Sequence, residues 1–254
     1  MPVMGKEAKN LIKHHFQAQE ELHGYTNPRA VATAISHELG TNIYTQRIER
    51  EVLRIASREY LYEGAADVVR NLLETGDTVT IWTQGHERGQ LWKVAMSGIG
   101  KLRHNLPPLE KKRLSVISAM DKIAKLPELF TASQAKGLQR IMIIDDKATN
   151  IVKASEQVTT ARENHILKKD TQVIPIWINQ GRTKNKVPEP FSLASFKEQF
   201  PHIEDIRAVL TLKQEFANEP ISWLIDFDHT LVHSAAMEAA LCDRIAGLVS
   251  SQQQ

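Results

Sequence analysis

The segment Leu224-Ile-Asp-Phe-Asp-His-Thr-Leu-Val232 decides how the rest of the chain is interpreted. It begins as a short apolar run typical of a buried β-strand, and Asp226 and Asp228 follow with one residue between them. Alternation along a strand is expected to place both carboxylates on the same side. Two carboxylates this close repel each other when ionised, so one keeps a proton or a cation neutralises them. The pair predicts a nucleophile beside an acid, or a metal site; the alternative is a solvated loop with two acids by accident.

A second apolar run also ends in two acids, in the segment Ile143-Ile-Asp145-Asp146. One or two carboxylates, completed by waters and a phosphate, are the oxygen ligands that magnesium prefers. The alternative is a carboxylate that caps the helix predicted after Thr149, and the segment alone favours neither interpretation.

Two weaker signals accompany these acids. The segment Trp82-Thr83-Gln84-Gly85 ends a predicted strand with a hydroxyl group and a glycine, which suit contact with a phosphate, although such a threonine is more often a turn residue. Lys125 opens a predicted helix, where a positive charge is unfavourable unless an anion lies nearby. The alternative for Lys125 is a solvated side chain.

From residue 63 onward, short apolar runs alternate with helical patterns. Strands are predicted at residues 78–82, 114–117, 141–144, 173–178 and 224–225, and helices at residues 64–75, 87–96, 127–136, 150–156 and, with an interruption at Pro201, 196–210. Such alternation indicates an α/β fold, a mostly parallel sheet with helices on both faces. Residues 5–62 show helical spacing alone, and a last helix is predicted at residues 233–249. Trp82, Trp177 and Trp223 lie on or beside strands and are predicted to belong to the core.

The composition of the chain limits the classes of protein and partner that are expected. The chain has 254 residues, 42% of them hydrophobic and 24% charged, which suits one domain with a small accessory part. The net charge of +2 gives no reason to expect nucleic acid or a membrane as the main partner. Cys242 is the only cysteine, so neither an internal disulfide nor a thiolate metal cage is expected. The first residues lack the apolar core of a secretory signal, and a cytoplasmic location is expected.

Together the four motifs resemble the pattern of the haloacid dehalogenase (HAD) superfamily over about residues 62–232. That family normally begins with the Asp-x-Asp-x-Thr strand. Here this strand comes last while the other three motifs keep their usual order, which resembles a circular permutation. The resemblance implies a Rossmann-like core at residues 63–232, with the nucleophile strand 221–228 supplied from near the C-terminus. It also implies an all-helical cap from residues 1–62 and the helix at about 233–250.

The resemblance implies a role for each matching residue. Asp226 would attack phosphorus to form an aspartyl-phosphate, and Asp228 would protonate the leaving oxygen and then activate water. Lys125 would balance charge on the nucleophile and the phosphoryl group, with Lys122 and Lys136 as alternatives. The residues implied to bind the substrate are Thr83, Gln84, Gly85 and Lys125. The implied magnesium ligands are Asp226, Asp146 and the backbone carbonyl of Asp228, and Asp145 is either a further ligand or in contact with one.

The resemblance thus implies a magnesium-dependent phosphatase that hydrolyses a phosphate monoester of a small metabolite. Asp228 favours a phosphatase because dehalogenase members of the family generally lack that acid. The alternative is a catalytically weak or inactive binding or regulatory protein that keeps the fold. The changed motif order motivates it, as does Asn150, which stands where many members carry another acid. The oligomeric state is left open.

Overall fold

The structure is a computed structural model of the chain, and it describes residues 60–85, 97–180, 187–216 and 219–233 almost continuously. Elsewhere it describes single residues: 10, 14, 15, 18, 33, 34, 37, 38, 87, 90, 93, 94, 236, 239, 240, 243, 244 and 247. The helices predicted within residues 5–62 and at residues 87–96 and 233–249 lie largely outside the described residues.

The chain divides into two compact units. The first comprises Met1–Tyr60, Gly85–Lys101 and His233–Gln254, and the second comprises Leu61–Gln84 and Leu102–Val232. The second unit contains the sheet and the predicted site residues other than Gly85.

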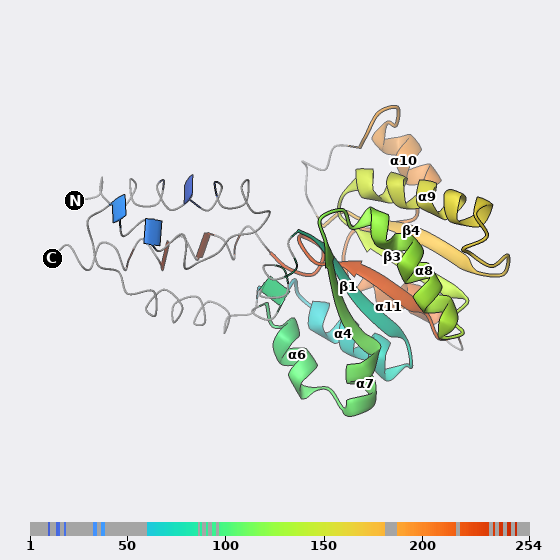
Figure 1. Cartoon of the computed structure of the whole chain (residues 1–254), viewed down its shortest axis with the longest axis horizontal. Coiled ribbons are helices and arrows are strands. Elements are labelled where there is room, and N and C mark those ends of the chain that lie inside the picture. Colours follow the sequence, from blue (N-terminus) through green and yellow to red (C-terminus); the bar gives the residue numbers. More distant parts are fainter. Residues whose placement is uncertain are drawn as a thin grey trace. The chain divides into compact units, whose positions relative to one another are not determined.

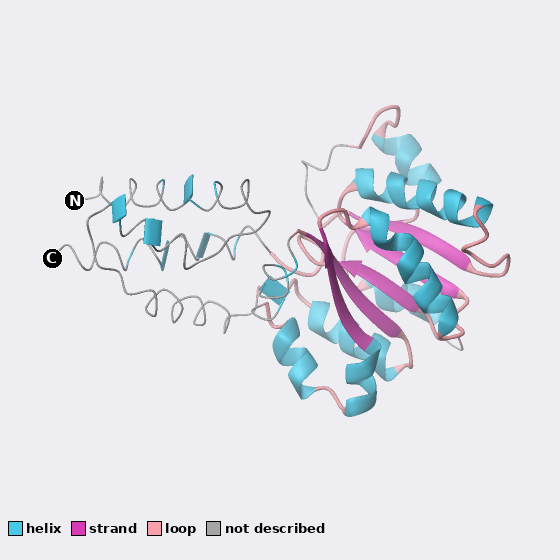
Figure 2. Cartoon of the chain, viewed as in Figure 1, coloured by secondary structure: helices cyan, strands magenta, loops and turns pink. Residues whose placement is uncertain are grey.

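The second unit is built on a six-stranded parallel sheet with the strand order β2-β1-β6-β3-β4-β5 (Figure 1, Figure 2). The strands are β1 (Thr78–Gln84), β2 (Leu114–Ala119), β3 (Arg140–Asp145), β4 (Gln172–Ile178), β5 (His202–Ile203) and β6 (Ser222–Asp226). β6 is the last of the described strands along the chain, yet it lies between β1 and β3. The predicted α/β fold with a parallel sheet is confirmed.

Helices cover both faces of this sheet (Figure 1, Figure 2). The helices in the described part of the chain are α4 (Ala65–Glu74), α6 (Ile99–Asn105), α7 (Pro108–Arg113), α8 (Leu126–Ala135), α9 (Ala148–Glu163), α10 (Leu193–Gln199) and α11 (Ala208–Gln214), with a 3-10 turn at Ile123–Lys125 before α8. α8 and α9 lie on one face, and α4 and α11 lie on the other (Figure 1). Within the described part of the chain, no helix is long and apolar enough to cross a bilayer.

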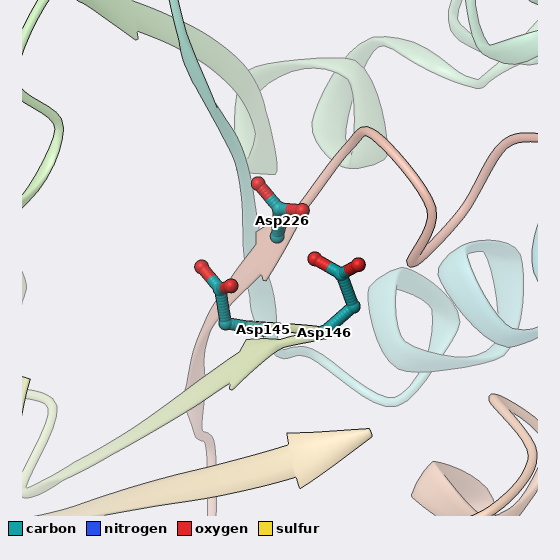
Figure 3. Close-up of side chains that lie close together, drawn as sticks. All are labelled: Asp145, Asp146 and Asp226. Atoms are coloured by element: carbon teal, nitrogen blue, oxygen red, sulfur yellow. The ribbon is translucent and has the colours of Figure 1, made fainter. Parts of the chain in front are cut away.

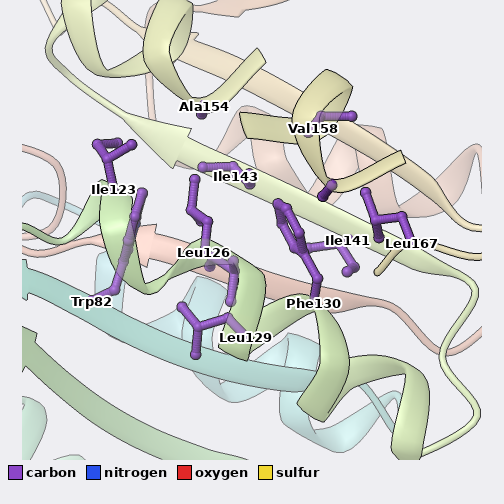
Figure 4. Close-up of a cluster of buried hydrophobic side chains, with 12 residues drawn as sticks. Trp82, Ile123, Leu126, Leu129, Phe130, Ile141, Ile143, Ala154, Val158 and Leu167 are labelled. Atoms are coloured by element: carbon purple, nitrogen blue, oxygen red, sulfur yellow. The ribbon is translucent and has the colours of Figure 1, made fainter. Parts of the chain in front are cut away.

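A buried hydrophobic cluster joins α8 and α9 to β1, β3 and β6 (Figure 4). Its members are Trp82, Ile123, Leu126, Leu129, Phe130, Ile141, Ile143, Ala154, Val158, Ala161, Leu167 and Leu224. Trp177 and Trp223 are also buried, so the three tryptophans that were predicted to belong to the core do so. Because both faces of the strands are covered, their residues read as continuous apolar runs in the sequence.

The structure differs from the predicted elements at three places. The interrupted helix predicted at residues 196–210 is confirmed only at its two ends, by α10 and α11; between them lies β5, whose His202 and Ile203 pair with the end of β4. The helices α6 and α7 were not predicted, because six or seven residues are too few to show a helical period and α7 buries no residue. β6 ends at Asp226, so strand alternation does not reach Asp228.

A buried polar group fixes the beginning of the central strands. Asp77, fully buried just before β1, accepts hydrogen bonds from Lys213 Nζ at 2.8 Å, the Ile221 backbone N–H at 2.9 Å and Trp223 Nε1 at 2.8 Å. A buried charge is tolerated when it is paired and when further donors satisfy it, as here. The contacts tie the segment entering β6 to the segment entering β1.

Candidate active site

Three buried carboxylates meet at the carboxyl ends of β3 and β6 (Figure 3). Asp145 ends β3, Asp146 follows it and Asp226 ends β6, and one oxygen from each lies within 4.8 Å of the others. The chain leads from β1 to β2 on one side of β6 and from β3 to β4 and β5 on the other. Open α/β sheets bind ligands at such a reversal of strand order, outside the carboxyl ends of the strands.

Lys122 supplies the positive charge of this group. Its ammonium lies 2.6 Å from Asp145 Oδ2 and donates a hydrogen bond to Asp226 Oδ1. The lysine is only 4% exposed, and it follows the carboxyl end of β2 by three residues. One ammonium thus bridges the ends of two strands that are adjacent in space and distant in sequence.

Burial and the neighbouring charges shift the pKa values of these groups. Burial alone would lower the pKa of Lys122, but the attraction of Asp226 and Asp145 outweighs it and raises that pKa. Burial raises the pKa of Asp226 well above its usual range; Lys122 opposes this rise, and Asp145 and Asp146 reinforce it. With every group ionised, three carboxylates and one ammonium leave two negative charges in excess. A divalent cation would neutralise that excess.

Asp145 is held by protein donors on both of its oxygens. Oδ1 accepts from the Lys147 backbone N–H at 2.9 Å and from Asn150 Nδ2 at 3.0 Å. Oδ2 accepts from Asn150 Nδ2 at 3.2 Å and lies against the Lys122 ammonium. A carboxylate offers about four lone-pair sites, so Asp145 has little capacity left for a metal ion.

Asp228 lies in a tight turn that follows β6. The turn is closed by backbone bonds from Leu231 and Val232 to the Phe227 carbonyl and from His229 to the Val232 carbonyl. His229 adopts a left-handed backbone conformation with φ of 63°. Asp228 is partly buried, and its carboxylate does not belong to the group formed by Asp145, Asp146 and Asp226. The turn, and not strand alternation, determines its position.

Thr230 and Gln180 link this turn to its surroundings. Thr230 Oγ1 donates to Asp226 Oδ2 at 3.3 Å, and Gln180 Nε2 donates to the Thr230 carbonyl at 2.6 Å. Gln180 follows the carboxyl end of β4, so the turn is held from a neighbouring strand of the sheet.

The predicted substrate-binding segment lies at the carboxyl end of β1. Thr83 is buried beside β6, one residue beyond Trp82, which pairs with Asp226. Gln84, the last residue of β1, is exposed. Gly85 has φ of +136°, and a Cβ atom there would lie 2.6 Å from Gln90 Nε2, so the backbone favours glycine. The substrate-binding role expected of these three residues stays a prediction.

The structure brings Lys122, and not Lys125, to the carboxylates. Lys125 is 44% exposed and pairs with Glu128 at 2.9 Å, an ordinary contact between residues three positions apart on a helix. Lys136 is exposed beyond the far end of α8. The position of Lys125 beside its own acid corrects the expectation that this lysine faces the nucleophile.

The sequence indicated Thr230 only as part of the Asp-x-Asp-x-Thr motif and Trp82 only as a core residue, and it gave no signal for Gln180. The sequence gives no means to prefer Lys122 over Lys125, because β2 ends at Ala119, two residues beyond the predicted end of that strand. The contact of Gln180 joins residues 50 positions apart and leaves no local signal.

No protein-family model matches the sequence, and no curated protein matches it. Among solved structures, the chain is similar to a protein from Burkholderia xenovorans named as a haloacid dehalogenase-like hydrolase. The two share 19% sequence identity with a TM-score of 0.44, over 71% of this chain and 75% of that one.

Proposed function

We propose that this protein is a magnesium-dependent phosphatase of the HAD type, which hydrolyses a phosphate monoester of a small metabolite. The observation that carries the proposal is the group of Asp145, Asp146 and Asp226 around Lys122 at the carboxyl ends of the two central strands. Strongly perturbed ionisable groups gathered at such an edge are typical of functional sites. The four motifs of the sequence resemble that family, and three of them end strands of this sheet.

The donor set fits magnesium. Magnesium takes oxygen ligands, and two excess negative charges on buried carboxylates favour one divalent cation. Because protein donors surround Asp145, we assign the metal to Asp226 and Asp146, with the backbone carbonyl of Asp228 as a further oxygen. When bound, the ion would neutralise charge on the phosphoryl oxygens. Asp145 would instead hold Lys122 in place.

The proposed reaction has two steps. In the first, an oxygen of Asp226 forms a bond to phosphorus as the bond to the ester oxygen breaks, and Asp228 gives its proton to the leaving oxygen. In the second, Asp228 takes a proton from water as the water oxygen attacks phosphorus, which releases phosphate and restores Asp226. Lys122 would balance charge at the nucleophile in both steps, the role first expected of Lys125. Thr83, followed by Gln84 and Gly85, would contact the phosphoryl oxygens.

We also propose that the motif order arose by circular permutation. The support is the position of β6, which is last in the chain and pairs with both β1 and β3 in the middle of the sheet. Residues 1–62 with about 233–250 would then be the cap, and residues 63–232 the core.

The test is hydrolysis of p-nitrophenyl phosphate by the full chain, with magnesium chloride or with a chelator. We expect magnesium-dependent turnover that Asp226→Asn abolishes, with Asp170→Asn, a change in an exposed loop, as the matched control. Equal rates for the natural chain and Asp226→Asn would refute the assignment of Asp226 as the nucleophile. Magnesium binding without turnover of p-nitrophenyl phosphate or of a panel of phosphorylated metabolites would favour the non-catalytic alternative.

A further inference from the structure

The indole ring of Trp82 lies directly against the Lys122 ammonium. Nζ is 4.7 Å from the ring centroid, within the range of a cation–π contact. Trp82 is 1% exposed and Lys122 is 4% exposed, so water does not screen the contact. A desolvated contact of this kind changes an equilibrium by about 5- to 30-fold.

The pairing of the strands explains why Trp82 reaches this lysine. Trp82 on β1 pairs with Asp226 on β6, and the pairing of Ile144 with Ile225 places Asp145 next along the neighbouring strand. Residues two apart on a strand share a face. Trp82, Leu224 and Ile143 lie in one hydrophobic cluster, so Asp226 and Asp145 project from the face that carries the indole. Figure 4 shows Trp82 beside Ile123, the residue after Lys122.

The ring complements the carboxylates chemically. An ammonium has three N–H donors, and those of Lys122 have Asp145 and Asp226 as acceptors. The face of an indole attracts a cation and offers it no oxygen acceptor. A ring on the remaining side therefore keeps the ammonium in place without competing for its hydrogen bonds.

Packing alone does not account for an indole at this position. Nε1 of Trp82 is buried without a hydrogen-bond partner, which is unfavourable. The buried Trp177 and Trp223 differ, because their Nε1 atoms donate to the Asp146 carbonyl and to Asp77 Oδ2, both at 2.8 Å. Phenylalanine at position 82 would keep an aromatic ring and remove the buried donor. The ring face is the part of Trp82 for which the structure shows a polar partner.

We infer that Trp82 is a positioning residue that holds the Lys122 ammonium between Asp145 and Asp226. This inference rests on the proposed function, in which Lys122 balances charge at the nucleophile. Trp82 itself touches no reacting atom and acts through the lysine.

The first test needs no activity. Lysines of the folded full chain are acetylated with limiting acetic anhydride, and the rate at each site is read by mass spectrometry. In Trp82→Leu, the rate at Lys122 should rise by about 5- to 30-fold, because the amine leaves its buried position more often. Lys213, a second buried lysine paired with Asp77 far along the strands, is the internal control for general opening of the fold. Its rate should not change.

The second test is turnover of p-nitrophenyl phosphate with saturating magnesium. Trp82→Leu should lower kcat by about 5- to 30-fold and Trp82→Phe by less, because the phenyl ring attracts a cation more weakly. The matched control is Trp223→Phe, the same change at an equally buried position on β6 whose indole binds Asp77. This control should keep kcat within about twofold of the natural chain.

The outcomes distinguish the positioning role of Trp82 from the proposed phosphatase function. Faster acetylation at Lys122 alone, with a graded loss of kcat, supports the inference. Acetylation that rises equally at Lys122 and Lys213 overturns it, because Trp82 would then only stabilise the fold. Selective acetylation with unchanged kcat overturns the positioning role. If the natural chain itself turns over no phosphate ester, the proposed function fails, while the acetylation rates still decide whether Trp82 holds Lys122.

Discussion

Asp226→Asn should stabilise the fold in the absence of metal while it removes activity. Asp226 lies within 4.8 Å of the carboxylates of Asp145 and Asp146. At an effective dielectric constant of about 20, each such pair repels by roughly 3.5 kcal/mol. The Lys122 ammonium offsets most of this repulsion, but burial of the Asp226 charge costs several kcal/mol more. From this balance we expect Asp226→Asn to raise the free energy of unfolding by about 1–3 kcal/mol.

The pH dependence follows from the raised pKa of Asp226. A carboxyl group with a higher pKa in the folded chain than in the unfolded chain binds its proton more tightly when folded. Stability is therefore lost as pH rises from about 4, the ordinary value for aspartate, through the raised pKa of the folded chain. The asparagine variant lacks this loss, so its advantage should be largest at alkaline pH and should vanish near pH 4.

The assay is thermal unfolding followed by near-ultraviolet circular dichroism, with a chelator, from about pH 4 to pH 8.5. Each kcal/mol should shift the midpoint by about 2–4 °C for a chain of this size. Magnesium at 100 times its dissociation constant should stabilise the natural chain by about 2.7 kcal/mol, and it should stabilise the variant by less. Asp228→Asn, outside the carboxylate group, is the control and should not gain stability. An Asp226→Asn midpoint below that of the natural chain at pH 8 in chelator would refute the reasoning.

Three further predictions test other contacts of the site and the sheet. Lys122→Met should lower kcat for p-nitrophenyl phosphate by about 100-fold or more, whereas Lys125→Met, at a partly exposed position away from the carboxylates, should leave kcat within about twofold. Equal losses would refute the assignment of Lys122. Asn150→Asp replaces the amide that donates to Asp145 with a fourth carboxylate, so urea unfolding in chelator should show a loss of about 1–3 kcal/mol that magnesium reduces. Asp77→Ala leaves Lys213 buried without its counter-charge and should cost about 3–5 kcal/mol in the same assay, whereas a loss below 1 kcal/mol would show that the pair has little effect.

The parallel sheet could be predicted because its strands are short, apolar and separated by helices. Both faces are covered, so runs such as Ile141–Ile144 stand out from the polar segments around them. The same argument predicted that Asp145, Asp146 and Asp226 follow strand ends, and the sheet brings those ends together. The three carboxylates share one edge of the sheet because its strands are parallel.

The lysine could not be assigned from the sequence because no periodic pattern positions it. Lys122 precedes a 3-10 turn and Lys125 is its last residue, three positions later, and only the path of that turn decides which one faces β6. Asp228 presents the same difficulty, because the turn from Phe227 to Val232 places it. The positions of side chains on irregular backbone are determined by tertiary contacts. Such contacts leave no signal in the spacing of residues along the sequence.

The central strand β6 is held by charged contacts at both of its ends, and this arrangement explains how the site keeps its geometry. All five residues of β6 are buried, so hydrophobic patterning distinguishes poorly between registers of the strand. A slip by one residue would turn Asp226 away from Lys122. At the start of β6, Asp77 binds the backbone of Ile221 and the indole of Trp223; at its end, Lys122 binds Asp226. Because a slip in either direction breaks both sets of contacts, the register that supports the fold is also the register that assembles the carboxylates.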